Sequence, residues 1–101
     1  MSRKGYEAEY IVKKKLIENF GRNGVVKVAI SQFGGDFLVI IKGKLYAVIE
    51  VKHCHRAKYY EDEKAKSQME RIREFCREHE CRGELWIKYP HKDIEVRDLM
   101  Q

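Results

Sequence analysis

The segment GGDFLVIIKGKLYAVIEVKH, residues 34–53, decides the fold of this chain. Two apolar runs, DFLVII and LYAVIEVKH, stand on either side of a tight connection at residues 42–44, and this pattern predicts a β-hairpin. Buried strands normally exclude charged groups. Here Asp36 starts the first run, and Glu50 and Lys52 stand near the end of the second. The hairpin therefore carries charges that need a structural or chemical reason.

The sequence on either side of the hairpin predicts one small α/β domain. Apolar residues recur at helical spacing over residues 3–19 and again over residues 60–80. Residues 25–31 are rich in β-branched side chains and residues 84–89 form another strand pattern, while residues 94–99 fit a last short strand or a loop. The predicted order is α-β-β-β-α-β around a central mixed sheet.

Composition and charge narrow the classes of function. The 101 residues include 21 Lys and Arg against 16 Asp and Glu, a net charge of +5 that suits a polyanionic partner such as nucleic acid. No run of about 18 apolar residues is present, so no membrane span is expected. The charged N-terminus lacks the apolar core of a secretory signal, and we expect a cytoplasmic protein, or one in the host cytoplasm if a virus encodes it. The three cysteines lack C-x-x-C spacing, and we expect them to be reduced.

Strand geometry predicts that the charged residues of the hairpin lie close together. Glu50 and Lys52 share a face because strand side chains alternate. With a three-residue connection, Asp36 faces Glu50 across the two strands. Two neighbouring carboxylates repel, and a hard divalent cation such as Mg²⁺ or Mn²⁺ offsets their charge better than a lysine alone. Such a metal would activate water against a phosphodiester, and Lys52 would orient that water or bind the developing negative charge.

The first helix adds a third carboxylate. Glu9 precedes Val12 by three residues and Leu16 by seven, so it continues the apolar stripe of that helix. A glutamate there is costly unless it faces a charge, and we expect it to point to the bound metal or its water. Two simpler interpretations stay open: Glu9 reaches solvent at the edge of the stripe, and Lys52 forms a structural salt bridge with an acid on a solvated sheet face.

These residues resemble a known nuclease signature. Asp36, followed on the next strand by Glu50, Val51 and Lys52, resembles the signature of the PD-(D/E)xK nuclease superfamily, without a proline before the aspartate. The opening RKGYEAE, residues 3–9, is similar to the start of archaeal Holliday junction resolvases of the Hjc type. The resemblance covers nearly the whole chain in element order and implies one nuclease domain over residues 1–101, with a restriction-endonuclease-like core.

The resemblance also implies an activity, a cofactor and a partner. It implies a Mg²⁺-dependent endodeoxyribonuclease, with Mn²⁺ as an alternative metal, that cuts four-way DNA junctions as a symmetric homodimer. It implies Glu9, Asp36 and Glu50 as metal ligands. Lys52 would be the catalytic lysine, so that all four side chains belong to the catalytic set.

Basic residues near the proposed site are the predicted DNA contacts. The resemblance implies phosphate contacts from the opening segment, and element ends and loops supply further basic side chains. The serine of the family's loop before the aspartate corresponds, at a shifted position, to Ser31. The predicted DNA-binding residues are Arg3, Lys4, Ser31, Lys42, Lys44, Arg56 and Lys58.

Two other functions remain open from the sequence. One is a PD-(D/E)xK endonuclease that acts on nicked, flapped or duplex DNA. The other is a nucleic-acid-binding protein that has the same fold and no catalytic activity. A four-way junction assayed beside linear duplex, flap and single strand separates these possibilities.

Overall fold

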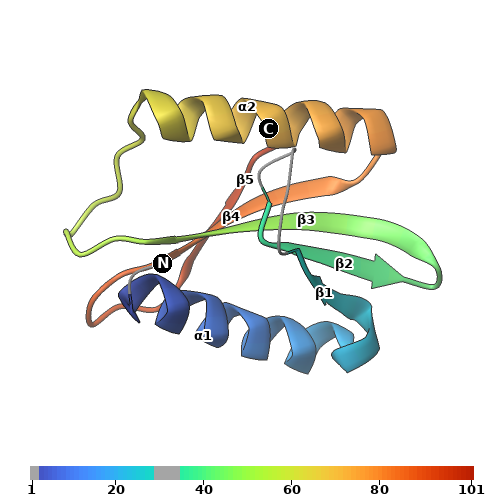
Figure 1. The fold of residues 1–101 in the computed structure, drawn as a ribbon, viewed down its shortest axis with the longest axis horizontal. Helices are drawn as coiled ribbons and strands as arrows, with labels where there is room; N and C mark the ends of the chain where they lie inside the picture. Colours follow the sequence, from blue (N-terminus) through green and yellow to red (C-terminus); the bar gives the residue numbers. More distant parts are fainter. Residues whose placement is uncertain (1–2, 29–34) are drawn as a thin grey trace.

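The computed structural model describes residues 3–28 and 35–101, with side chains from residue 6 onward (Figure 1). Its elements follow the predicted order and include the last short strand, so the mixed α/β fold is confirmed. In chain order they are α1 (Arg3–Phe20), the 3-10 turn η1 (Arg22–Gly24), β1 (Val25–Lys27), β2 (Phe37–Ile41), β3 (Lys44–His53), α2 (Glu63–His79), β4 (Arg82–Lys88) and β5 (Glu95–Asp98).

Several element boundaries differ from the sequence pattern, and the two largest differences are at the start of the second helix and at the end of the first strand. The second helix begins at Glu63 because Asp62 is its N-cap, and the Asp62 carboxylate accepts a hydrogen bond from the backbone N–H of Ala65 at 2.8 Å. The first strand ends at Lys27. Of the remainder of that predicted strand, Val28 is described and lies beyond the strand, and residues 29–31 lie outside the described residues.

The sheet has five strands in the order β1-β2-β3-β4-β5. The pairing is antiparallel except between β3 and β4, which run parallel. A parallel pair needs a crossover, and α2 supplies it. Figure 1 shows α1 below the sheet and α2 above it, so the molecule has three layers. We call the two faces the α1 side and the α2 side.

An apolar core lies on each side of the sheet. On the α1 side, Leu16 and Val12 of the helix pack with Phe37 and Ile49 of the hairpin. On the α2 side, the helix packs its own apolar stripe against alternate residues of β3 and β4; this cluster contains Val48, Cys54, Met69, Ile72, Cys76, Leu85, Ile87, Tyr89 and Leu99. The central strand β3 is thus buried on both faces, which explains its apolar composition.

The connection between β2 and β3 differs from the predicted three-residue turn. It is a two-residue turn in which Lys42 and Gly43 have φ of 52° and 78°, the backbone that twisted hairpins favour. The pairing then shifts between Val39 and Ile40, which leaves Tyr46 as the extra residue of a β-bulge. The bulge restores the offset that a three-residue turn would have produced.

None of the described helices is long and apolar enough to cross a membrane. The three cysteines are free thiols, with Cys54 and Cys76 buried.

Candidate active site

Glu50 lies on β3 and is 2% exposed. Among the described residues, it is the charged residue that the fold buries. Its neighbours at alternate positions, Val48 and Lys52, place it on the α2 side. Burial, together with the hydrogen bond and charge of Asp36, raises the pKa of Glu50 from 4.5 to about 9 against the opposing effects of Lys52 and the Val51 backbone N–H. Glu50 is therefore protonated at neutral pH in the free protein.

Asp36 lies beside Glu50 because of the hairpin offset. Phe37 pairs with Ile49, and Asp36 is the residue immediately before that pair. The backbone N–H of Val51 donates to Asp36 Oδ2 at 2.8 Å and to Glu50 Oε1 at 3.2 Å. The two side chains also share a hydrogen bond. A pair of carboxyl groups can do so only when one of them carries a proton, and this bond is one of the causes of the raised pKa of Glu50.

Lys52 is held next to this pair by the second helix. Its Nζ lies 3.7 Å from Glu50 Oε2 and donates a hydrogen bond to Gln68 Oε1 at 2.8 Å. The lysine side chain is 29% exposed, so it reaches from the buried carboxyl toward solvent. Sequence reasoning missed Gln68, although a polar residue three positions after Ala65, on the apolar stripe of α2, was a signal for it.

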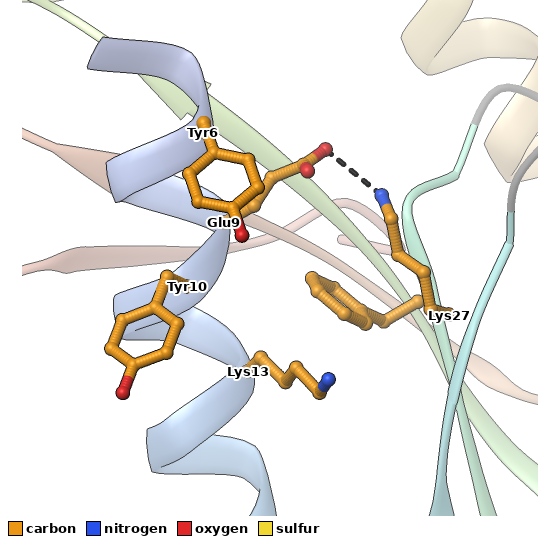
Figure 2. A pocket seen from close by; sticks show the side chains of 6 residues that line it. Tyr6, Glu9, Tyr10, Lys13 and Lys27 are labelled. Atoms are coloured by element: carbon orange, nitrogen blue, oxygen red, sulfur yellow. Dashed lines mark hydrogen bonds and ion pairs between the residues drawn. The ribbon is translucent and has the colours of Figure 1, made fainter. Parts of the chain in front are cut away.

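Glu9 approaches from the opposite helix and does not turn outward. Its side chain is 13% exposed, and its Oε1 accepts a hydrogen bond from Lys27 Nζ at 3.0 Å. Figure 2 shows the carboxylate pointing away from α1 toward Lys27. The same Nζ lies 3.9 Å from Asp36 Oδ1. Lys27 therefore lies between Glu9 and Asp36, and the two oxygens of Asp36 have different neighbours: Oδ1 faces Lys27, whereas Oδ2 accepts from the backbone of Val51.

Sequence reasoning also missed Lys27. It is the last residue of β1 and pairs with Phe37 of β2, which places its Nζ 5.1 Å from the centre of the Phe37 ring. A charged residue inside an otherwise β-branched strand was the available signal. Its meaning depends on the β1–β2 register, which the sequence alone did not give.

The described residues contain no group of three His, Cys, Asp or Glu side chains placed to hold a metal ion. The structure brings two of the three predicted ligands, Asp36 and Glu50, into contact, whereas Glu9 is separated from them by the ammonium of Lys27. Carboxylate oxygens are the donors that Mg²⁺ prefers, and protein Mg²⁺ sites commonly use one or two carboxylates with waters and a substrate phosphate. The pair thus fits a hard divalent cation.

The predicted DNA contacts are divided between the two ends of the hairpin. Arg56 and Lys58 lie in the exposed loop after β3, at the end that carries Lys52. Lys42 and Lys44 lie at the turn, about 20 Å along the strands from Asp36. They therefore lie at the far end of the hairpin from the candidate site. The side chains of Arg3 and Lys4, and all of Ser31, lie outside the described residues.

No family model matches this chain, and no curated protein matches its sequence. Among solved structures, the chain is similar in fold to Hjc of Archaeoglobus fulgidus, a Holliday junction resolvase from an archaeal hyperthermophile. The TM-score is 0.67 at 18% sequence identity, over 95% of this chain and 73% of that chain. Together with the described elements, this likeness shows that the chain shares the mixed α/β fold of that structure.

Proposed function

We propose that this chain is a metal-dependent endodeoxyribonuclease whose active site is the Asp36–Glu50 pair. One observation carries the proposal: a buried glutamic acid is hydrogen-bonded to an aspartate at the end of a hairpin, with Lys52 3.7 Å from the glutamate. Burying two adjacent carboxyls is unfavourable for folding, and a hard cation supplies the compensating charge. The likeness in fold to a Holliday junction resolvase supports the same chemistry.

The mechanism assigns a separate task to each side chain. When bound, Mg²⁺ or Mn²⁺ would lower the pKa of a water and stabilise charge on the scissile phosphate. Asp36 and Glu50 would hold the metal, and Glu50 must first release its proton. Lys52, fixed by Gln68, would orient the attacking water or bind the developing negative charge.

Glu9 would join the site when Lys27 moves. Lys27 now neutralises Glu9 at 3.0 Å and lies 3.9 Å from Asp36 Oδ1. A divalent cation bound to Asp36 would repel this ammonium at short range. Lys27 could then turn to a DNA phosphate, since 42% of its side chain is already exposed, and Glu9 would become available to the metal or its water.

The proposed substrate is a four-way DNA junction, cut by a symmetric homodimer. The net charge of +5 suits a polyanion, and the fold neighbour is a junction resolvase. A junction has approximate two-fold symmetry, so two equal sites related by a two-fold axis would nick opposite strands. Sedimentation of the free protein and of its junction complex tests the dimer.

The test is cleavage of a four-way junction, linear duplex, flap and single strand, each with Mg²⁺, Mn²⁺ or EDTA. We expect paired symmetrical nicks on the junction with either metal and none with EDTA. Asp36→Asn and Glu50→Gln should lose cutting and keep DNA binding, while Glu63→Gln, whose side chain is 97% exposed, serves as the matched control. Preferential cutting of duplex or flap would exclude the resolvase assignment, and binding without cutting by the unmodified protein would exclude the enzyme.

A further inference from the structure

A pocket on the α1 side opens directly beside the candidate active site. Figure 2 labels five of its lining residues: Tyr6, Glu9, Tyr10 and Lys13 come from α1, and Lys27 comes from β1. Phe37 of β2 also lines the pocket. The pocket has a volume of about 130 Å³. It shares Glu9 and Lys27 with the chain of charges that leads to Asp36. A group bound there would thus reach Lys27, whose Nζ lies 3.9 Å from Asp36 Oδ1.

The two tyrosines of this pocket are unusually exposed. Tyr6 and Tyr10 keep 66% and 60% of their accessible surface, although large aromatic side chains normally bury most of theirs. They are four residues apart in a helix and so lie on the same face, one turn from each other. Their exposure costs free energy in the isolated protein, and a flat partner would recover it.

The charge around the rings indicates what kind of partner fits. Lys13 is exposed at the rim, and Lys27 is 42% exposed on the opposite wall. Exposed aromatic rings with flanking ammonium groups match the two parts of a nucleotide, a base that stacks and a phosphate that pairs. A second copy of this basic chain fits less well, because it would bring further positive charge to these lysines.

We propose that the pocket lined by Tyr6, Tyr10, Lys13 and Lys27 binds one unstacked nucleotide of the DNA strand, next to the scissile phosphate. The base stacks on a tyrosine ring, and its phosphate pairs with Lys13 or Lys27. This inference rests on the proposed function and deepens it, since it makes an unstacked base part of the recognised substrate. A four-way junction interrupts base stacking at its branch point and a flap carries single-stranded bases there, whereas intact duplex stays stacked throughout.

The experiment uses four-way junctions that carry 2-aminopurine at the branch point, with EDTA present so that binding is measured without cutting. We expect the unmodified protein to change the 2-aminopurine fluorescence. Tyr6→Ala/Tyr10→Ala should lose that change and bind the junction about tenfold more weakly, as for the loss of base–aromatic stacking. Tyr6→Phe/Tyr10→Phe, which keeps both rings, should restore both signals.

The control is Tyr46→Ala, which removes a ring that packs on Phe20 at the far end of β3. It should leave the fluorescence change intact, with folding of every variant checked by circular dichroism. The inference is overturned if the double alanine variant keeps the fluorescence change. It is also overturned if this variant loses dimerisation and keeps its affinity for the junction, because the tyrosines would then contact a second copy of the chain. Because the test contains no metal, its outcome does not depend on cleavage. A protein that never cuts DNA can still bind the base in this way, and an active nuclease can lack this binding, so the two proposals fail independently.

Discussion

The two sides of the sheet each place a glutamate against a lysine, but the pairs differ in burial. On the α2 side, Glu50 is 2% exposed and lies 3.7 Å from Lys52. On the α1 side, the Glu9 side chain is 13% exposed and lies 3.0 Å from Lys27, which borders an open pocket. A nearby lysine does not keep Glu50 ionised, because burial and Asp36 raise its pKa more than Lys52 lowers it.

This difference assigns separate work to the two sides. On the buried α2 side, Glu50 would hold the metal and would have to release its proton when the metal binds. The open α1 side would receive the DNA strand. Asp36 lies between them, with one oxygen 2.8 Å from the Val51 nitrogen and the other 3.9 Å from Lys27 Nζ. Variants of the two glutamates therefore test whether the division is real.

The largest expected effect is on cleavage. Glu50→Gln should lower the single-turnover cleavage rate of a junction about 1,000-fold, because it removes a direct ligand of the proposed metal. Glu9→Gln should lower it about tenfold, since Glu9 is held apart from the pair by Lys27 in the free protein. Rates measured with saturating protein and Mg²⁺ check both values. Equal losses in the two variants would contradict the division between the sides.

The second effect is the pH dependence of metal binding. The Glu50 pKa of about 9 means that its proton must leave when the metal binds. Mn²⁺ affinity should therefore rise about tenfold per pH unit as pH increases toward 9, and calorimetry in two buffers should show proton release. Glu9→Gln should keep this slope. A slope near zero in the unmodified protein would show that Glu50 is not a ligand.

The third effect is on stability without metal. The pKa of Glu50 is raised on folding from 4.5 to about 9, so the folded state binds the extra proton in that window and stability falls as pH rises through it. Glu50→Gln should remove this slope and raise the free energy of unfolding by about 5 kcal/mol at pH 8.5, since each pKa unit of the shift corresponds to about 1.4 kcal/mol. Glu9→Gln should change it by no more than about 1 kcal/mol. Urea unfolding from pH 5 to 9 measures the difference.

The smallest effect concerns the positioning of Lys52. Gln68→Ala removes the acceptor of its 2.8 Å hydrogen bond and should lower the cleavage rate by a factor of about five. Gln68→Glu keeps an acceptor and should recover most of the rate. Because Gln68 does not touch the proposed metal, Mn²⁺ affinity should not change in either variant, and a parallel loss of affinity would assign Gln68 another role.

The sequence predicted the fold because its signals are local. The apolar periods of the two helices and of the hairpin each lie within one short segment, and the alternation in β3 placed Glu50 and Lys52 on one face. These features depend only on residue type and spacing. The placement of Asp36 beside Glu50 was also predicted, but from a three-residue turn, and the structure reaches the same offset by a two-residue turn and the bulge at Tyr46.

The missed residues depend on contacts between distant segments. Lys27 meets Glu9 across the β1–α1 packing, and Gln68 meets Lys52 across the β3–α2 packing. The spacing of residues along the chain predicts neither contact, because each depends on how a helix packs against the sheet. The expected cluster of three acids failed to appear among the described residues for the same reason: the position of Lys27 decides what Glu9 can reach.

The bulge at Tyr46 has a consequence for comparing such proteins by sequence. In a regular hairpin closed by Lys42 and Gly43, the pairing seen next to the turn would continue along both strands without a shift. Asp36 would then pair with Ile49. The two acids would then project from opposite surfaces and could not share a proton or an ion. One looped-out residue corrects this parity, so an alignment that deletes the residue between Leu45 and Ala47 describes a protein without this site.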